Sequence, residues 1–187
     1  MNDTHPKQEA APTAAIILIG NELLSGRTQD TNLKYIASQL CGHGITLRET
    51  RVIPDDHQVV VSTVNTLRHA HDYVFTTGGI GPTHDDITAD CVADAFGVAL
   101  PVHPEAERRL LDFFKQRDIE ANEDRLRMAR IPEGGELIDN PVSAAPGFRI
   151  DNVFVMAGVP RIMQVMFDSI LPSLRKGPAI ELSLIHI

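Results

Sequence analysis

Tryptophan is absent from this chain, cysteine occurs twice, and aromatic residues make up only 5% of its 187 residues. Cys41 and Cys91 cannot build a disulfide framework and lack the CxxC spacing of a zinc site, so both are expected to be small buried hydrophobes. No apolar run approaches the roughly 20 residues of a membrane-spanning helix. Residues 1–13 also lack the apolar centre of a signal peptide. These absences predict a cytoplasmic protein with no membrane partner.

Positive charge is also scarce, because 17 Lys and Arg residues stand against 25 Asp and Glu residues, for a formal net charge of −8. Nucleic-acid binding needs a basic surface that releases counterions from phosphates. The composition therefore argues against a nucleic-acid partner. The length and the 43% content of hydrophobic residues suit one globular domain with a real core.

Apolar, β-prone runs alternate with segments of helical periodicity along the first half of the chain. Strands are expected at 14–19, 46–53, 73–77, 136–138, 149–150 and 153–156. Helices are expected from a cap at Asp30 or Thr31 to about residue 40, from a cap at Asp55 or Asp56 through residue 67, and at 88–96, 104–115, 122–129 and 161–171. Right-handed crossovers then predict an α/β fold of three layers, α/β/α, with a mostly parallel central sheet.

The expected domain covers residues 14–176. Residues 1–13 are polar and rich in Pro and Ala, and we expect them to be a disordered lead. Residues 177–187 form a tail whose last six residues, LSLIHI, fit nothing before them. They match the read-through of a sequencing-library end, so this tail is expected to be truncated or artefactual.

A glycine-rich loop follows the strand expected at 73–77. Gly78, Gly79 and Gly81 would let bare backbone N–H groups approach an anion closely. The loop has neither the lysine of a P-loop nor the spacing of a dinucleotide fingerprint. A tight strand-to-helix turn would use the same glycines, so the loop alone leaves both interpretations open.

Two adjacent carboxylates, Asp85 and Asp86, come directly after the loop and would repel a bare phosphate. A divalent cation between carboxylate and phosphate resolves the conflict, because Mg²⁺ takes phosphate oxygens as co-ligands. The alternative is that one of the two only caps the helix that begins at Thr88, and we expect one of them to do so. Glu22 and Asp55 follow the first two strands, and the ends of parallel strands meet at one sheet edge.

The segment TTGGIGPTHDDIT at 76–88 resembles the signature of the MoaB/Mog-type molybdopterin-binding domain family. Its His-Asp-Asp form is similar to the CinA (competence/damage-inducible protein A) branch of that family. GNELLSG at 20–26, VIPDD at 52–56, NPVSAAPGF at 140–148 and GVP at 158–160 agree with it in order. The resemblance covers about residues 14–172.

This resemblance implies a site for a nucleotide or pterin phosphate at the sheet edge, with Asp55 and Asp86 at the positions of functional aspartates. Asp85 and Asp86 are the metal ligands expected from their place beside the glycine loop. The segment 140–148 would form the wall opposite the loop. The other expected ligand contacts are Glu22, Thr77, Gly78, Gly79, Gly81, Pro82, Thr83, Asn140, Ser143, Pro146 and Gly147. Two residues depart from the family pattern: Ser143 replaces an expected glycine, and Ile162 replaces an expected glutamate, which puts a metal or ribose role there in doubt.

Three functions follow from the resemblance. The CinA branch implies a pyrophosphatase for ADP-ribose or a similar dinucleotide, with Asp86 and Asp55 as catalytic residues and Mg²⁺, Mn²⁺ or Co²⁺ as cofactor. The Mog side implies a molybdopterin-binding protein of molybdenum cofactor biosynthesis. A non-catalytic nucleotide-binding module is the third. The family commonly forms dimers or trimers, so a homo-oligomer is expected.

Overall fold

A six-stranded sheet forms the centre of the computed structural model, which describes residues 10–178. Most of the expected lead (1–13) and tail (177–187) therefore lies outside the described residues. In spatial order the strands are β2 (Thr46–Ile53), β1 (Thr13–Ile19), β3 (Tyr73–Thr77), β6 (Val153–Met156), β5 (Gly147–Ile150) and β4 (Glu136–Ile138). The first four run parallel, and β5 and β4 continue the sheet in antiparallel pairs. The mostly parallel sheet predicted from the sequence is confirmed.

Helices connect the strands and cover the sheet. They are α1 (Asn21–Leu24), α2 (Asn32–Gly42), α3 (His57–Ala70), α4 (Thr88–Phe96), α5 (Pro104–Gln116), α6 (Glu123–Leu126) and α7 (Pro160–Ile170), with short 3₁₀ turns at Arg127–Ala129 and Leu171–Ser173. No helix was predicted where α1 lies, because four residues are too few to show helical periodicity. Among the described residues, no helix is long and apolar enough to cross a membrane.

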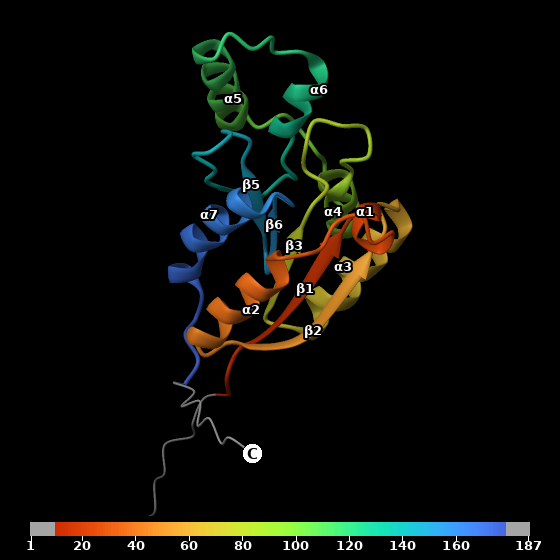
Figure 1. The fold of residues 1–187 in the computed structure, drawn as a ribbon, viewed down its shortest axis with the longest axis vertical. Coiled ribbons are helices and arrows are strands. Elements are labelled where there is room, and N and C mark those ends of the chain that lie inside the picture. Colours follow the sequence, from red (N-terminus) through yellow and green to blue (C-terminus); the bar gives the residue numbers. More distant parts are fainter. Residues whose placement is uncertain (1–9, 179–187) are drawn as a thin grey trace, which may run out of the picture.

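The two faces of the sheet have separate cores. Along β1, Ile17 and Ile19 pack with α3, α4 and α5, whereas Ile16 and Leu18 pack with α2 and α7. This alternation is the period of a strand buried on both faces, and it makes the predicted three layers. In Figure 1, α5 and α6 lie beyond the ends of the strands, apart from the layers formed by the other long helices.

An aromatic cluster fills the core under α7. The ring of Phe75 on β3 lies 5.2 Å from the ring of Phe154 and 5.3 Å from that of Phe167, measured between centroids. All three side chains are at most 1% exposed. The phenol of Tyr35 on α2 donates a 2.7 Å hydrogen bond to Asp168 on α7, so a polar contact closes the outer side of this core.

The two cysteines differ from each other in burial. Cys91 is buried on α4 as predicted, and burial raises the pKa of its thiol to about 12. Cys41 is only partly buried, so the prediction that both are buried is wrong for that residue. It lies on the last turn of α2, where the helix reaches the surface.

Phe75→Ala should lower the free energy of unfolding by about 3–5 kcal/mol, because it removes a fully buried ring from a close-packed cluster. Leu111→Ala on α5 is the control, since Leu111 is 41% exposed and its loss should change stability by less than about 0.5 kcal/mol. Urea unfolding followed by circular dichroism measures both. Equal effects of the two substitutions would contradict the assigned core.

Candidate ligand-binding site

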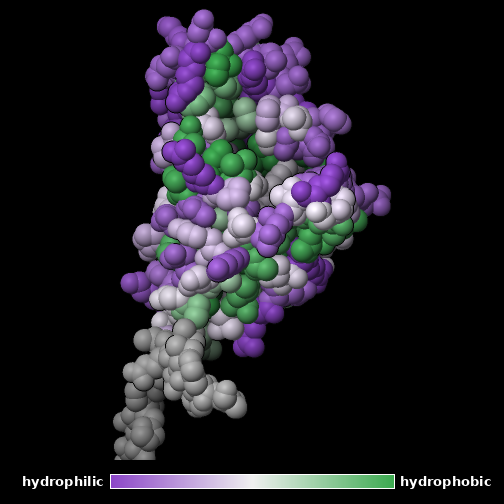
Figure 2. Space-filling view, viewed as in Figure 1, coloured by the Kyte–Doolittle hydropathy of each residue, from purple (hydrophilic) through white to green (hydrophobic). Residues whose placement is uncertain are grey.

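A cavity of about 640 Å³ opens at the edge of the sheet where the parallel strands end. Residues that follow β1, β2, β3 and β6 line it together with the aromatic side of α5. Figure 2 shows hydrophobic residues around a hollow below α5 and α6. The volume lies within the range of about 300–1,000 Å³ that is typical of small-molecule sites. The convergence of strand ends predicted from the sequence has therefore produced a pocket.

The glycine loop after β3 is held against the sheet by close backbone contacts. Gly78 has φ 102°, and a Cβ atom there would lie 2.3 Å from the carbonyl oxygen of Ile19. Gly79 has φ 68°, and its Cβ would lie 2.1 Å from the hydroxyl of Thr88. That hydroxyl donates a 3.0 Å hydrogen bond to the Gly78 carbonyl. Glycine is thus needed at both positions, because the backbone has a positive φ and because there is no room for a Cβ atom.

Three consecutive backbone N–H groups of this loop, those of Gly79, Ile80 and Gly81, lack hydrogen-bond acceptors among residues 10–178. The loop carbonyls of Gly78 and Gly79 accept hydrogen bonds from Thr88. By contrast, no acceptor within residues 10–178 takes the N–H groups of Gly79, Ile80 or Gly81. All three residues line the cavity. A run of unpaired N–H groups after a strand is an anion-binding arrangement.

Asp85 and Asp86 line the cavity and share one hydroxyl. Thr83 donates to Asp86 through its N–H at 2.9 Å and through its Oγ at 2.6 Å, and the same Oγ contacts Asp85. The Thr83 hydrogen bond, more than the nearby His84, lowers the pKa of the Asp85 carboxyl. The expectation that one of these aspartates caps α4 is wrong, because Ile87 is the N-cap and no side chain bonds there.

Asp55 and Glu22 reach the same cavity from the ends of β2 and β1. Asp56 caps α3 by accepting from the N–H of Val59 at 3.0 Å, so Asp55 has no role in that cap. Asp55 instead accepts from the N–H of Asn21 at 2.9 Å, which ties it to α1. The Glu22 carboxylate folds back over Gly20, where a Cβ would lie 2.4 Å from it. Four carboxylates therefore share one pocket.

The opposite wall is the loop that begins at Asn140. The side-chain amide of Asn140 donates to the Ser143 hydroxyl at 2.6 Å and to the Ala145 carbonyl at 2.8 Å, so both of its hydrogens are used inside the loop. Asn140 lines the cavity as predicted, but it shapes the wall rather than offering a free amide. The Ser143 hydroxyl accepts from Asn140, and within residues 10–178 no acceptor takes its own proton. This loop also contains Ala144 with φ 60°.

Four of the predicted contacts lie outside the lining of the main cavity. Thr77 is buried in β3. Thr83 does not line the cavity but hydrogen-bonds to Asp85 and Asp86, which do. Pro146 lines a small recess behind the glycine loop. Gly147 is in β5, where a Cβ would lie 2.4 Å from the Val155 carbonyl, so packing within the sheet explains its lack of a side chain. The remaining ten predicted residues are Glu22, Asp55, Gly78, Gly79, Gly81, Pro82, Asp85, Asp86, Asn140 and Ser143, and all line the cavity.

Sequence reasoning missed the apolar side of the pocket. Phe113, Phe114 and Met128 line it, and none of the three was among the predicted ligand contacts. The signal that was available is the position of the two phenylalanines three and four residues after Leu110 within α5, which is helical spacing. Ile162, where the resemblance led us to expect glutamate, adds another apolar side chain.

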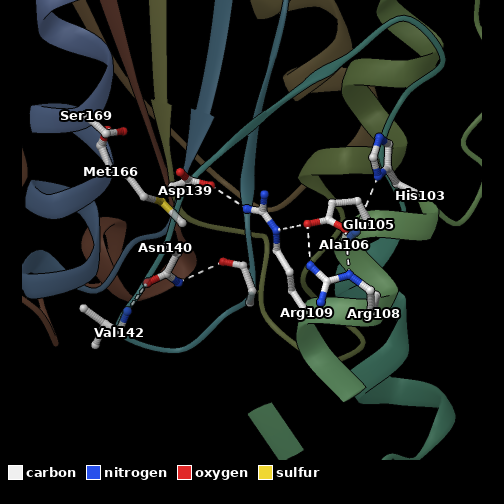
Figure 3. A network of polar contacts seen from close by, with 11 residues as sticks. His103, Glu105, Ala106, Arg108, Arg109, Asp139, Asn140, Val142, Met166 and Ser169 are labelled. Atoms are coloured by element: carbon white, nitrogen blue, oxygen red, sulfur yellow. Dashed lines mark hydrogen bonds and ion pairs between the residues drawn. The ribbon is translucent and has the colours of Figure 1, made fainter. Parts of the chain in front are cut away.

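Ion pairs hold α5 over the pocket. Arg109 donates to Glu105 at 2.7 Å on the same helix and also binds Asp139, next to Asn140 (Figure 3). Hydrogen bonds from Arg108 and Arg109 lower the pKa of Glu105 to about 2. A second cavity, of about 410 Å³, lies on this side and shares Phe113 and Asn140 with the first.

Together these features define an α/β domain with a glycine-loop pocket at the carboxyl ends of its parallel strands. The family described as "Probable molybdopterin binding domain" matches residues 15–176, and the chain belongs to this family. The resemblance stated from the sequence is therefore confirmed.

Two curated relatives show how far the similarity extends. A protein of Aeropyrum pernix is 39% identical over 87% of this chain and 62% of its own length. A CinA-like protein of Sulfurihydrogenibium sp. is 36% identical over 86% of this chain and 42% of its own length. The chain thus spans less than two thirds of these two relatives.

Solved structures agree with the CinA branch. The protein CinA from Thermoplasma acidophilum, described as having unknown function, has a TM-score of 0.80 and 32% identity, covering 87% of this chain and 98% of that one. The molybdopterin biosynthesis enzyme MoaB from Thermus thermophilus has a TM-score of 0.57 and 16% identity, over 87% and 91% of the two chains. The second match shows the shared fold only.

Gly79→Ala tests how tightly the loop is held. Gly26 has φ 71° with nothing within 4 Å of an added Cβ, whereas at Gly79 the Cβ would meet Thr88. Both substitutions place alanine in the left-handed region, at a cost of about 1–2 kcal/mol. Gly79→Ala should lower the free energy of unfolding by roughly 1–3 kcal/mol more than Gly26→Ala, because of overpacking. Matched urea unfolding curves measure the difference, and equal losses would contradict the described loop.

Proposed function

We propose that this pocket binds a phosphorylated ligand built on a flat ring, either a pterin phosphate or a nucleotide. The observation that carries the proposal is the run of unpaired N–H groups at Gly79, Ile80 and Gly81 on the wall of a cavity. Such donors match the non-bridging oxygens of a phosphate. The apolar side formed by Phe113 and Met128 suits the ring.

The family description supports the same class of ligand. The matched family is a molybdopterin-binding one, and molybdopterin combines a pterin with a phosphate. This favours ligand binding over any particular reaction, so the molybdopterin-type role stands ahead of the hydrolase. The number of copies in the assembly stays a prediction.

A divalent cation is a proposed part of this site. Within residues 10–178, no three His, Cys, Asp or Glu side chains converge to form a complete metal site. Mg²⁺ needs only one or two carboxylates when substrate phosphates complete its shell. The Thr83 Oγ contacts a carboxylate oxygen of Asp85 and one of Asp86. Because the hydroxyl has a single proton, it can donate to only one of the two carboxylates at a time. A cation bound between Asp85 and Asp86 would stabilise the carboxylate that receives no proton. Carboxylate oxygens are suitable ligands for Mg²⁺, Mn²⁺ or Co²⁺.

Hydrolysis of a diphosphate such as ADP-ribose is the second candidate, and the paired aspartates favour it. A cation, when bound, supplies charge neutralisation and activation of water. The amides of Gly79, Ile80 and Gly81 would hold the non-bridging oxygens as negative charge builds on them. Asp55 and Glu22 would orient the ligand from the ends of their strands. The pyrophosphatase thus uses the same pocket as the binding function.

A ligand screen tests the binding function. AMP, ADP-ribose and a phosphorylated pterin are titrated with Mg²⁺ while thermal unfolding is followed. A ligand present at 100 times its Kd should add about 2.7 kcal/mol to the stability of the folded chain. The matching compounds without phosphate should stabilise far less. If no phosphorylated compound raises the unfolding temperature, the proposal is wrong.

Asp55→Asn and Asp56→Asn form a matched pair for the hydrolase. Each removes one negative charge, but only Asp55 lines the cavity. Asn also caps helices, so Asp56→Asn should leave stability nearly unchanged. With ADP-ribose and Mg²⁺, Mn²⁺ or Co²⁺, Asp55→Asn and Asp86→Asn should each slow AMP release on the order of a hundredfold. Asp56→Asn should match the unsubstituted protein.

Chromatography of the products measures AMP release in all four proteins. Absence of AMP from the unsubstituted protein with every metal would exclude the hydrolase and leave the binding function standing. Equal rates for Asp55→Asn and Asp56→Asn would contradict the assignment of Asp55.

A further inference from the structure

The charge of the pocket poses a problem for an anionic ligand. Glu22, Asp55, Asp85 and Asp86 line the main cavity, and within the described part of the chain no Lys, Arg or His lines it. A phosphate at the loop amides would therefore face repulsion from several directions. Positive charge has to come from another part of the protein or from a bound cation.

The 3₁₀ turn Arg127–Ala129 brings arginine to the back of the glycine loop. Arg127 and Arg130 line a small recess of about 20 Å³ together with Gly79, Gly81 and Asp86. Those last three residues also line the main cavity, so the recess and the cavity meet at the loop. The loop has no lysine or arginine of its own, and an arginine about 45 residues further along the chain lies beside it.

The arginines of this segment differ in what they bind. Arg130 makes two hydrogen bonds to the Asp90 carboxylate, at 2.8 and 3.1 Å, which neutralises its charge. Arg125 donates to the Glu120 carbonyl at 2.6 Å. The Arg127 guanidinium has neither a hydrogen bond nor an ion pair with any of residues 10–178, although it is partly buried. Arg127 is thus the guanidinium still available for an anion.

We infer that Arg127 is a ligand-binding residue that contacts the phosphate held at the glycine loop. The inference rests on the proposed function and adds to it the residue that selects an anionic group. A guanidinium offers two parallel N–H donors that match two phosphate oxygens. The phosphate would then be held by the amides of Gly79 to Gly81 and by Arg127, whose positive charge would offset the repulsion from Asp86.

Calorimetric titrations with three probes at a fixed Mg²⁺ concentration test this role. ADP-ribose carries phosphate and ring, inorganic pyrophosphate carries phosphate alone, and adenosine carries the ring and ribose alone. Arg127→Gln should weaken ADP-ribose and pyrophosphate binding by at least about tenfold, because a charge-assisted hydrogen bond is lost. Adenosine binding should stay the same. Arg127→Lys should recover part of the loss, since it keeps the charge without the paired donors.

Arg125→Gln is the matched control, because Arg125 is two residues away and lines neither the recess nor the main cavity. It should bind all three probes as the unsubstituted protein does. The inference is overturned if Arg127→Gln binds ADP-ribose normally, or if it weakens adenosine and ADP-ribose equally, since a purely structural role would do that. Failure of the unsubstituted protein to bind either phosphate probe would instead overturn the proposed function itself.

Discussion

The close packing of backbone at the carboxyl end of β3 is the constraint on which the pocket depends. Gly78 lies against the Ile19 carbonyl, and an added Cβ at Gly158 would be 3.2 Å from the Gly78 Cα, so three strand ends meet with no side chain between them. Thr88 completes the arrangement by bonding the loop carbonyls from the start of α4. Thr88 thus occupies the carbonyls of Gly78 and Gly79, whereas the N–H groups of Gly79, Ile80 and Gly81 have no acceptor within residues 10–178.

The same constraint explains how the carboxylates come together. Parallel strands that end at one edge bring their following residues close to each other, even when these lie far apart in the sequence. Glu22, Asp55 and Asp86 come from three such ends. The sequence could predict this gathering because Glu22 and Asp55 closely follow apolar runs and Asp86 follows the glycine loop after a third run. The sequence alone therefore predicted the positions of the strands and the mostly parallel sheet. It also predicted most of the carboxylates that line the site.

The rest depended on tertiary contacts that leave no local signal. Either Asp85 or Asp86 was a reasonable cap for α4, but Thr83 draws both carboxylates toward its own hydroxyl. Phe113 was hidden within a charged helix, because a sequence does not show which end of the sheet a helix will cover. Arg127 could not be linked to the glycine loop, since only the path of the chain through α5 and α6 brings it there.

Charge balance then narrows the class of ligand. A neutral ring alone would bring no charge to the carboxylates beside Thr83 or to Arg127, whose guanidinium has no partner among residues 10–178. In the proposed function, a phosphate would satisfy the arginine and the loop amides, and through a shared cation it would also satisfy Asp85 and Asp86. A diphosphate would do both at once with two separate groups. The distribution of charge around the loop therefore favours the proposed phosphorylated ligand over its ring alone.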